Sequence, residues 1–178
     1  MAFTATYSAI APCSREPNFY RDLIISLQAK GAKCVIDSSG ETLSKSIEAN
    51  PWLLKVNESE YLELKDKTAD TTEGIITLLK NDTTLKNIII TLGGDGSIAK
   101  IHGKCYRITL PKITAKNATA SGDIFLGKLL EALQSNKEIK TALIEASSFA
   151  ASNCLYWYPH IDMNDVNEIK EQITLEEL

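Results

Sequence analysis

The segment Ile88-Ile-Ile-Thr-Leu-Gly-Gly-Asp-Gly-Ser97 indicates the fold class, because a continuous apolar run in it ends abruptly at glycines. Apolar residues that follow one another without alternation are typical of a parallel strand buried on both faces. Similar runs precede this segment at 32–36 and 52–56, and helical patterns separate the three. The sequence therefore predicts a three-layer α/β fold in which helices cover both faces of a mainly parallel sheet.

The other elements are predicted from apolar periodicity and from turn residues. No repeat or linker interrupts them, so residues 1–178 are interpreted as a single domain. The expected elements are a strand at 2–7, a helix that follows Pro17 and closes at Gly31, a short helix at 41–49, a helix carrying Ile75 and Leu79, a hairpin around His102-Gly103-Lys104 at one edge of the sheet, and helices near 121–134, 137–155 and 164–172.

Composition and charge exclude several classes of protein. The net charge of −4 and the scattered lysines and arginines leave no basic footprint for nucleic acid. No apolar run approaches the ~20 residues of a membrane span, and the N-terminus has no signal-peptide pattern. The four cysteines lie far apart, without the spacing of a zinc site. Reduced thiols in a cytoplasmic protein are the expectation.

The segment Thr119-Ala-Ser-Gly-Asp-Ile-Phe125 stands at the start of a strongly amphipathic helical pattern. Ser121 is predicted to cap this helix, and the first-turn N–H groups around Ser121 and Gly122 suit an anion. Asp123 would lie at the positive end of the helix and stay ionised. Phosphoryl transfer to an alcohol needs such an anion site and a base for the hydroxyl proton. Taken alone, however, this segment is more often only a helix cap.

Thr91, Gly93, Gly94 and Gly96 belong to the turn that follows the strand at 87–92. Glycines at the carboxyl end of a parallel strand let the backbone approach a phosphate closely, at the edge where open α/β sheets bind ligands. A glycine turn that merely joins the strand to the hairpin is about as common an explanation.

Lys55, Asn57 and Glu60 end another predicted strand. They could hold phosphate oxygens and a hydrated Mg²⁺ ion, which takes one or two protein carboxylates and keeps several waters. The same Asn-x-x-Glu pattern is also a helix cap with a capping-box glutamate, and this alternative is strong.

Together, in this order and spacing, the three segments resemble the second half of the phosphofructokinase B family of carbohydrate kinases, which have the ribokinase-like fold. Asp37-Ser-Ser-Gly40 followed by Leu43 is similar to a motif of its 1-phosphofructokinase and tagatose-6-phosphate kinase branch. The stretch 168–178 also resembles the C-terminus of that branch, so the resemblance covers essentially the whole chain.

The resemblance implies a transferase that passes a phosphoryl group from Mg-ATP to a hydroxyl of a sugar phosphate. Asp123 matches the catalytic base, and Ser121 and Gly122 match positions of the anion hole. Glu60 matches a glutamate linked to magnesium. The positions that match nucleotide-binding residues are Lys55, Asn57, Thr91, Gly93, Gly94, Gly96 and Asn153.

The chain departs from the family pattern in three ways. The strands, the lid and the sugar-binding residues with which family members begin have no counterpart, so the chain is expected to be incomplete and inactive alone. Residues 8–14 are all that represents a segment that frames the acceptor site. Ala120 replaces a glycine and is expected either to adopt a strained φ or to narrow the anion hole, and Ile124 replaces a small residue.

Two classes of function remain open. One is a kinase module that binds nucleotide and a sugar phosphate, and that self-associates or has a partner covering its exposed sheet edge. The other is a non-catalytic pseudokinase remnant that acts as a nucleotide-binding or protein-interaction domain. Retention of Asp123, Glu60 and Asn57 favours the first, whereas Ala120 and Ile124 favour the second.

Overall fold

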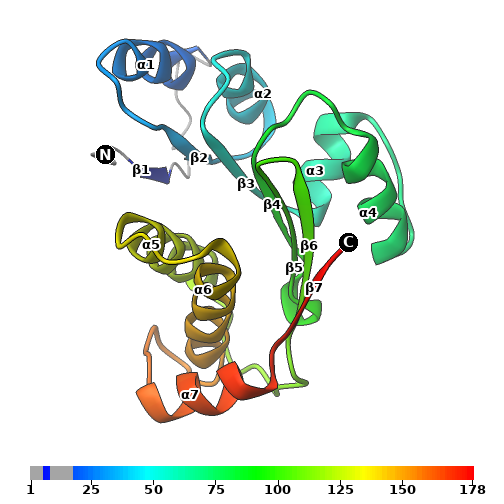
Figure 1. Ribbon diagram of the computed structural model, residues 1–178, viewed down its shortest axis with the longest axis vertical. Coiled ribbons are helices and arrows are strands. Elements are labelled where there is room, and N and C mark those ends of the chain that lie inside the picture. The colour runs from blue at the N-terminus through cyan, green and yellow to red at the C-terminus, as the bar shows by residue number, and fades with distance from the viewer. Residues whose placement is uncertain (1–5, 9–17) are drawn as a thin grey trace. The chain divides into compact units, whose positions relative to one another are not determined.

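The computed structural model describes residues 6–8 and 18–178 (Figure 1). The chain forms two compact units. The first takes in the described residues through Thr91 together with Ile98–Cys105, and the second takes in Leu92–Ser97 together with Tyr106–Leu178. Cys13 and the segment 9–14 lie outside the described residues, as does most of the strand expected at 2–7.

The first unit is built on parallel strands. β1 (Thr6–Ser8), β2 (Val35–Asp37), β3 (Leu53–Asn57) and β4 (Ile88–Thr91) pair in that order, and each of the three pairs is parallel. Ile88, Ile89 and Ile90 are fully buried, which confirms that the continuous apolar run is an interior strand. The carboxyl ends of β2, β3 and β4 consequently lie at one edge, where Asp37 pairs with Lys55 and Asn57 with Thr91.

Helices join these strands, and all but the one at Glu58–Lys65 were among the expected elements. They are α1 (Phe19–Gln28), α2 (Gly40–Glu48), α3 (Glu58–Lys65) and α4 (Thr72–Asn81). The chain leaves α1 through Gly31, which has a φ of +84° that favours glycine. None of the described helices combines the length and the apolarity that a membrane span requires.

A buried polar cluster lies where α3 meets the end of α4. The Asp82 carboxylate accepts hydrogen bonds from the amide and the hydroxyl of Thr84 and lies 2.7 Å from Lys65 Nζ. Tyr61 is fully buried nearby, and no partner for its hydroxyl is found among the described residues. Burial, with the Asp82 charge second, raises the pKa of Tyr61 far above its usual value.

Replacing Tyr61 by phenylalanine is expected to leave the free energy of unfolding unchanged or to raise it by about 1 kcal/mol, since an unpaired buried hydroxyl costs free energy. Urea unfolding of the wild type and of Tyr61→Phe measures the difference. Tyr156→Phe is the matched control, because Tyr156 donates to Asp165 Oδ2 at 2.7 Å and its loss should destabilise. A clear loss of stability in Tyr61→Phe would show that the hydroxyl has a partner.

The second unit is mainly helical. Its helices are α5 (Ser121–Gln134), α6 (Ile139–Cys154) and α7 (Met163–Gln172); α5 packs on α6 and α6 on α7 (Figure 1). Glu145 on α6 joins them, because its carboxylate lies 3.8 Å from Nζ of Lys128 on α5 and 3.4 Å from Nζ of Lys170 on α7. Lys137, in the connection between α5 and α6, lies 2.7 Å from the same carboxylate. The hydrogen bond from Lys137 outweighs burial and lowers the pKa of Glu145, so this carboxylate is a charged anchor of the three helices.

The hairpin was predicted to lie at one edge of the sheet, and this prediction was wrong. β5 (Ser97–Ile101) and β6 (Lys104–Thr109) flank His102-Gly103 as expected, but the hairpin is not the edge of the sheet. A strand that the sequence did not predict, β7 (Thr174–Glu177), pairs antiparallel with β6 and lies beyond it. The strand pairing is therefore mixed, since β1 to β4 pair in parallel and β6 pairs antiparallel with β7.

Candidate active site

The turn after β4 is shaped by glycines at two positions. Gly93 opens a short 3-10 turn, Gly93–Asp95, with a φ of +60°, and Gly96 ends it with a φ of +99°. The Leu92 amide donates to the Gly96 carbonyl at 2.8 Å and closes the loop. A Cβ on Gly96 would lie 2.1 Å from the Ile108 carbonyl oxygen, so only glycine fits there.

Gly94 is different. Its φ is not in the left-handed region, and a Cβ built on it would meet nothing within 4 Å. The described residues therefore do not require glycine at this position. A ligand that approaches the backbone closely would require it, as the phosphate hypothesis predicts.

The helix α5 begins at Ser121, as expected, but its cap differs from the prediction. The N-cap residue is Ala120, without a side-chain cap, and its φ of +66° is left-handed, as the substitution of alanine for glycine led us to expect. Ser121 is the first helical residue, and its Oγ accepts from Asn153 Nδ2 at 2.8 Å instead of capping its own helix. A tertiary hydrogen bond has thus taken the hydroxyl that local patterning assigned to the cap.

Gly122 and Asp123 complete the first turn of α5, and the Asp123 side chain is exposed. First-turn N–H groups have no acceptor within their own helix, which gives this end its affinity for anions. The Ser121 amide already donates to the Ala118 carbonyl at 3.1 Å. An anion at this helix end would therefore depend on the backbone N–H groups that follow Ser121, beside the Asp123 carboxylate.

Lys55 is held by a partner that the sequence reasoning missed. Only 8% of the residue is exposed, and its Nζ lies 2.7 Å from Asp37 Oδ2. The two residues are direct neighbours in the register of β2 and β3. The sequence did contain a signal for this ion pair, because Asp37 and Lys55 both lie at the ends of strands that were predicted to be adjacent and parallel. A phosphate that binds Lys55 would have to share its ammonium group with Asp37.

Asn57 and Glu60 form the capping box that was the alternative explanation of their spacing. The Glu60 amide donates to Asn57 Oδ1 at 2.9 Å, and the Asn57 amide donates to Glu60 Oε2 at 2.7 Å. Thr91, the register neighbour of Asn57, donates its hydroxyl to the Val56 carbonyl at 3.3 Å. These bonds fix the ends of β3 and β4 and leave Oε1 of Glu60 outside the capping box.

A hydrated magnesium ion is compatible with the side chains at the end of β3. The described residues contain no cluster of three or more His, Cys, Asp or Glu side chains placed to hold a metal ion. Zinc and other metals that need several protein ligands therefore fit poorly in this part of the chain. A hydrated Mg²⁺ ion needs only one or two carboxylates, and Glu60 can supply one through Oε1.

Asn153, predicted to contact the nucleotide, lies within the protein and is only 1% exposed. Its Nδ2 donates to the Thr119 carbonyl at 2.9 Å and to Ser121 Oγ, and its Oδ1 accepts from the His160 amide at 3.0 Å. Both amide hydrogens are therefore used inside the second unit. A direct contact with a nucleotide stays a prediction, and it would compete with these bonds.

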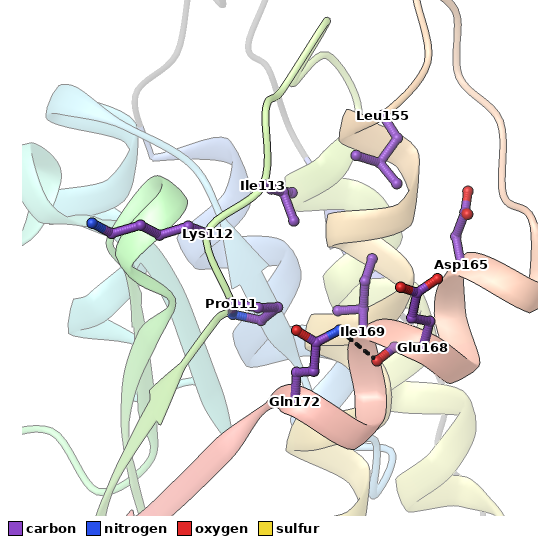
Figure 2. Close-up of a pocket in the computed structure, with 8 residues that line it drawn as sticks. All are labelled: Pro111, Lys112, Ile113, Leu155, Asp165, Glu168, Ile169 and Gln172. Atoms are coloured by element: carbon purple, nitrogen blue, oxygen red, sulfur yellow. Dashed lines mark hydrogen bonds between the residues drawn. The ribbon is translucent and has the colours of Figure 1, made fainter.

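A cavity in the second unit is not formed by the predicted site residues. It measures about 240 Å³, and Figure 2 shows Ile113, Leu155 and Ile169 around it, with the carboxylates of Asp165 and Glu168 on the α7 side. Lys112 extends away from the other lining residues in the same view. The Asp165 carboxylate is already bound by the Tyr156 hydroxyl, and this hydrogen bond raises the pKa of Tyr156 to about 12.

Comparison with known proteins assigns the chain to a family. A profile of pfkB family carbohydrate kinases matches residues 4–161. A tagatose-6-phosphate kinase from Staphylococcus epidermidis is 27% identical over 98% of this chain and 58% of its own length. A 1-phosphofructokinase from Borreliella burgdorferi is 30% identical over 77% of this chain and 45% of its own length. The chain thus matches 58% and 45% of the lengths of these two relatives, about half in each case.

Solved structures agree on the fold. Phosphofructokinase-2 from Escherichia coli in complex with potassium superposes with a TM-score of 0.83 at 20% identity, over 94% of this chain and 56% of that one. A tetrameric inhibited form of the same enzyme gives 0.81 at 20% identity, over 96% and 57%. The fold is therefore that of ribokinase-like kinases, and the predicted α/β class is confirmed. The chain belongs to the pfkB family of carbohydrate kinases, and its curated relatives are sugar-phosphate kinases.

Proposed function

We propose that this chain is the nucleotide-binding part of an ATP-dependent sugar-phosphate kinase of the 1-phosphofructokinase or tagatose-6-phosphate kinase type. The observation that carries the proposal is the position of Asp123. Within a pfkB family chain, a carboxylate has been kept in the first turn of α5, where backbone N–H groups favour an anion. A base beside an anion site is the arrangement that phosphoryl transfer needs.

In this proposal each residue has a defined task. The sugar-phosphate hydroxyl attacks the γ-phosphorus of ATP, the bond to the ADP oxygen breaks, and Asp123 accepts the hydroxyl proton. N–H groups at the start of α5, with Gly122 leaving them accessible, stabilise the charge on the transferring group. Gly93, Gly94 and Gly96 accommodate nucleotide phosphates, and Lys55 neutralises one of them.

Glu60 and Asn57 would hold the magnesium end of Mg-ATP through bound water. When bound, Mg²⁺ neutralises charge on the phosphate oxygens. The capping box keeps the Glu60 carboxylate in place while Oε1 remains outside it. Glu60 therefore has both a structural and a metal-binding role in this proposal.

Glu60→Gln is expected to weaken Mg-ATP binding about tenfold and to abolish its dependence on magnesium, since a charge-assisted contact is lost. Glutamine can keep the capping-box hydrogen bond, so the fold should be retained. Isothermal calorimetry with ATP, with and without Mg²⁺, measures both effects. Glu58→Gln, a neighbouring carboxylate outside the capping box, is the control. Equal Mg-ATP affinities for the wild type and Glu60→Gln would remove Glu60 from the metal site.

Location and assembly follow from the proposed reaction. ATP and sugar phosphates are cytoplasmic metabolites, so we place the protein in the cytoplasm. Phosphofructokinase-2 from Escherichia coli has a tetrameric form, and we propose that this chain also self-associates. The pseudokinase alternative rests on the strained Ala120 and would be supported by nucleotide binding without transfer.

A further inference from the structure

Asn153 donates hydrogen bonds to the residues on both sides of Ala120, which precedes α5 and has a left-handed backbone conformation. Its Nδ2 donates to the Thr119 carbonyl at 2.9 Å and to Ser121 Oγ at 2.8 Å, and Ala120 stands between them with a φ of +66°. An L-residue with a Cβ adopts this conformation only at a cost in free energy that glycine avoids. Some interaction must therefore hold Ala120 in place.

The hydrogen bonds around Asn153 form a consistent network. The Cys154 thiol donates to the Ala150 carbonyl at 3.4 Å, so its sulfur is available to accept from the Ser121 hydroxyl at 3.1 Å. Ser121 in turn uses its oxygen to accept from Asn153. Every donor has an acceptor, and a fully satisfied buried network of this kind fixes a single conformation.

The network is also anchored on its far side. Asn153 Oδ1 accepts from the His160 amide at 3.0 Å, and the Cys154 carbonyl accepts from the Lys116 amide at 2.7 Å. The end of α6 is thereby bonded to the chain before α5 and to the loop after α6. Asn153 can hold its amide rigidly because its own helix and both flanking segments constrain it.

We propose that Asn153 is a positioning residue: its amide clamps the backbone on either side of Ala120 and so sets the first-turn N–H groups of α5 for an anion. The importance of this for catalysis rests on the proposed function, whereas the clamp itself does not. Asn153 acts on the nucleotide through the backbone of Thr119–Ser121 and not by touching it. Asn153→Asp removes the amide donor but keeps the acceptor, since ionised aspartate offers an oxygen to the His160 amide and cannot donate.

The test uses the whole chain and two readouts. The three-bond HN–Hα coupling and the Cα chemical shift of Ala120 report its φ by NMR, and calorimetry gives the affinity for Mg-ATP. In Asn153→Asp we expect Ala120 to leave the left-handed region and Mg-ATP to bind about tenfold more weakly. In the Ala120→Gly background the same change should cost about threefold or less, because glycine tolerates the turn unaided. Asn136→Asp, at an exposed position, controls for the added charge.

Each outcome decides the proposal. An unchanged φ of Ala120 in Asn153→Asp overturns the clamp, and so does an equal loss of affinity in the alanine and glycine backgrounds. If no variant, the wild type included, binds Mg-ATP, the proposed function fails while the φ of Ala120 still decides the clamp. If Asn153→Asp does not fold, the single variant Ala120→Gly decides the proposal. A clamp that strains Ala120 requires the Tm of Ala120→Gly to exceed that of the wild type, and an equal or lower Tm overturns the proposal.

Discussion

The 178-residue chain is expected to bind Mg-ATP and yet to release ADP no faster when tagatose 6-phosphate, fructose 1-phosphate or fructose 6-phosphate is added. Phosphoryl transfer depends on positioning and on electrostatic stabilisation, and a hydroxyl held in line is worth about 7–11 kcal/mol of the barrier. The tagatose-6-phosphate kinase relative is matched over 58% of its length. Asp123 without a positioned hydroxyl has no proton to accept.

A coupled assay of ADP release, with each sugar phosphate in turn, measures this. Sugar-dependent turnover would contradict the expectation and would mean that the chain builds its own acceptor site. In that case Asp123→Asn must lower kcat by about 10²–10⁴-fold, the usual contribution of a general base. Glu131→Gln, an exposed carboxylate further along α5, should leave kcat unchanged. Turnover that survives Asp123→Asn would remove Asp123 from the catalytic role.

The strand β4 could be predicted because its composition alone indicates that it is buried. Ile88–Ile90 contain no polar residue, so a strand made of them must be buried on both of its faces. The bounds of α5, 121–134, were also predicted, since its apolar residues recur at helical spacing. In both cases the deciding signal lies within the element itself.

β7 could not be predicted because its partner lies far away in the sequence. Thr174–Glu177 contains two glutamates and a single apolar residue, Leu175, which is only half-buried. This composition is typical of a solvated chain end. The strand exists because its backbone pairs with Tyr106–Thr109, and pairing of that kind leaves little trace in the residues themselves.

The site residues show the same limit. The spacing of apolar residues predicted where α5 begins. The Ser121 hydroxyl, however, accepts a hydrogen bond from Asn153, 32 residues away, and so does not cap the helix. Spacing also selected Lys55 without indicating that Asp37, 18 residues earlier, holds its ammonium group. Local patterns thus located the polar residues, whereas long-range hydrogen bonds determine which of their atoms remain available to a ligand.

Gly96→Ala and Gly94→Ala are expected to separate the glycine that the fold needs from the glycine that a ligand needs. In Gly96→Ala the new Cβ would meet the Ile108 carbonyl oxygen at 2.1 Å, and a φ of +99° is unsuited to alanine. Displacing a backbone carbonyl and straining the turn together should lower the free energy of unfolding by about 3 kcal/mol. Urea unfolding followed by circular dichroism measures this loss.

Gly94→Ala places its Cβ in open space at an ordinary φ, so stability should change by less than about 0.5 kcal/mol. If phosphates approach this turn, the same methyl group must weaken Mg-ATP binding, and Gly94→Val must weaken it further because its side chain is larger. Calorimetry on the two variants, both folded, gives the comparison. Unchanged affinity in both would mean that Gly94 faces no ligand, and the turn would then serve only to join β4 to β5.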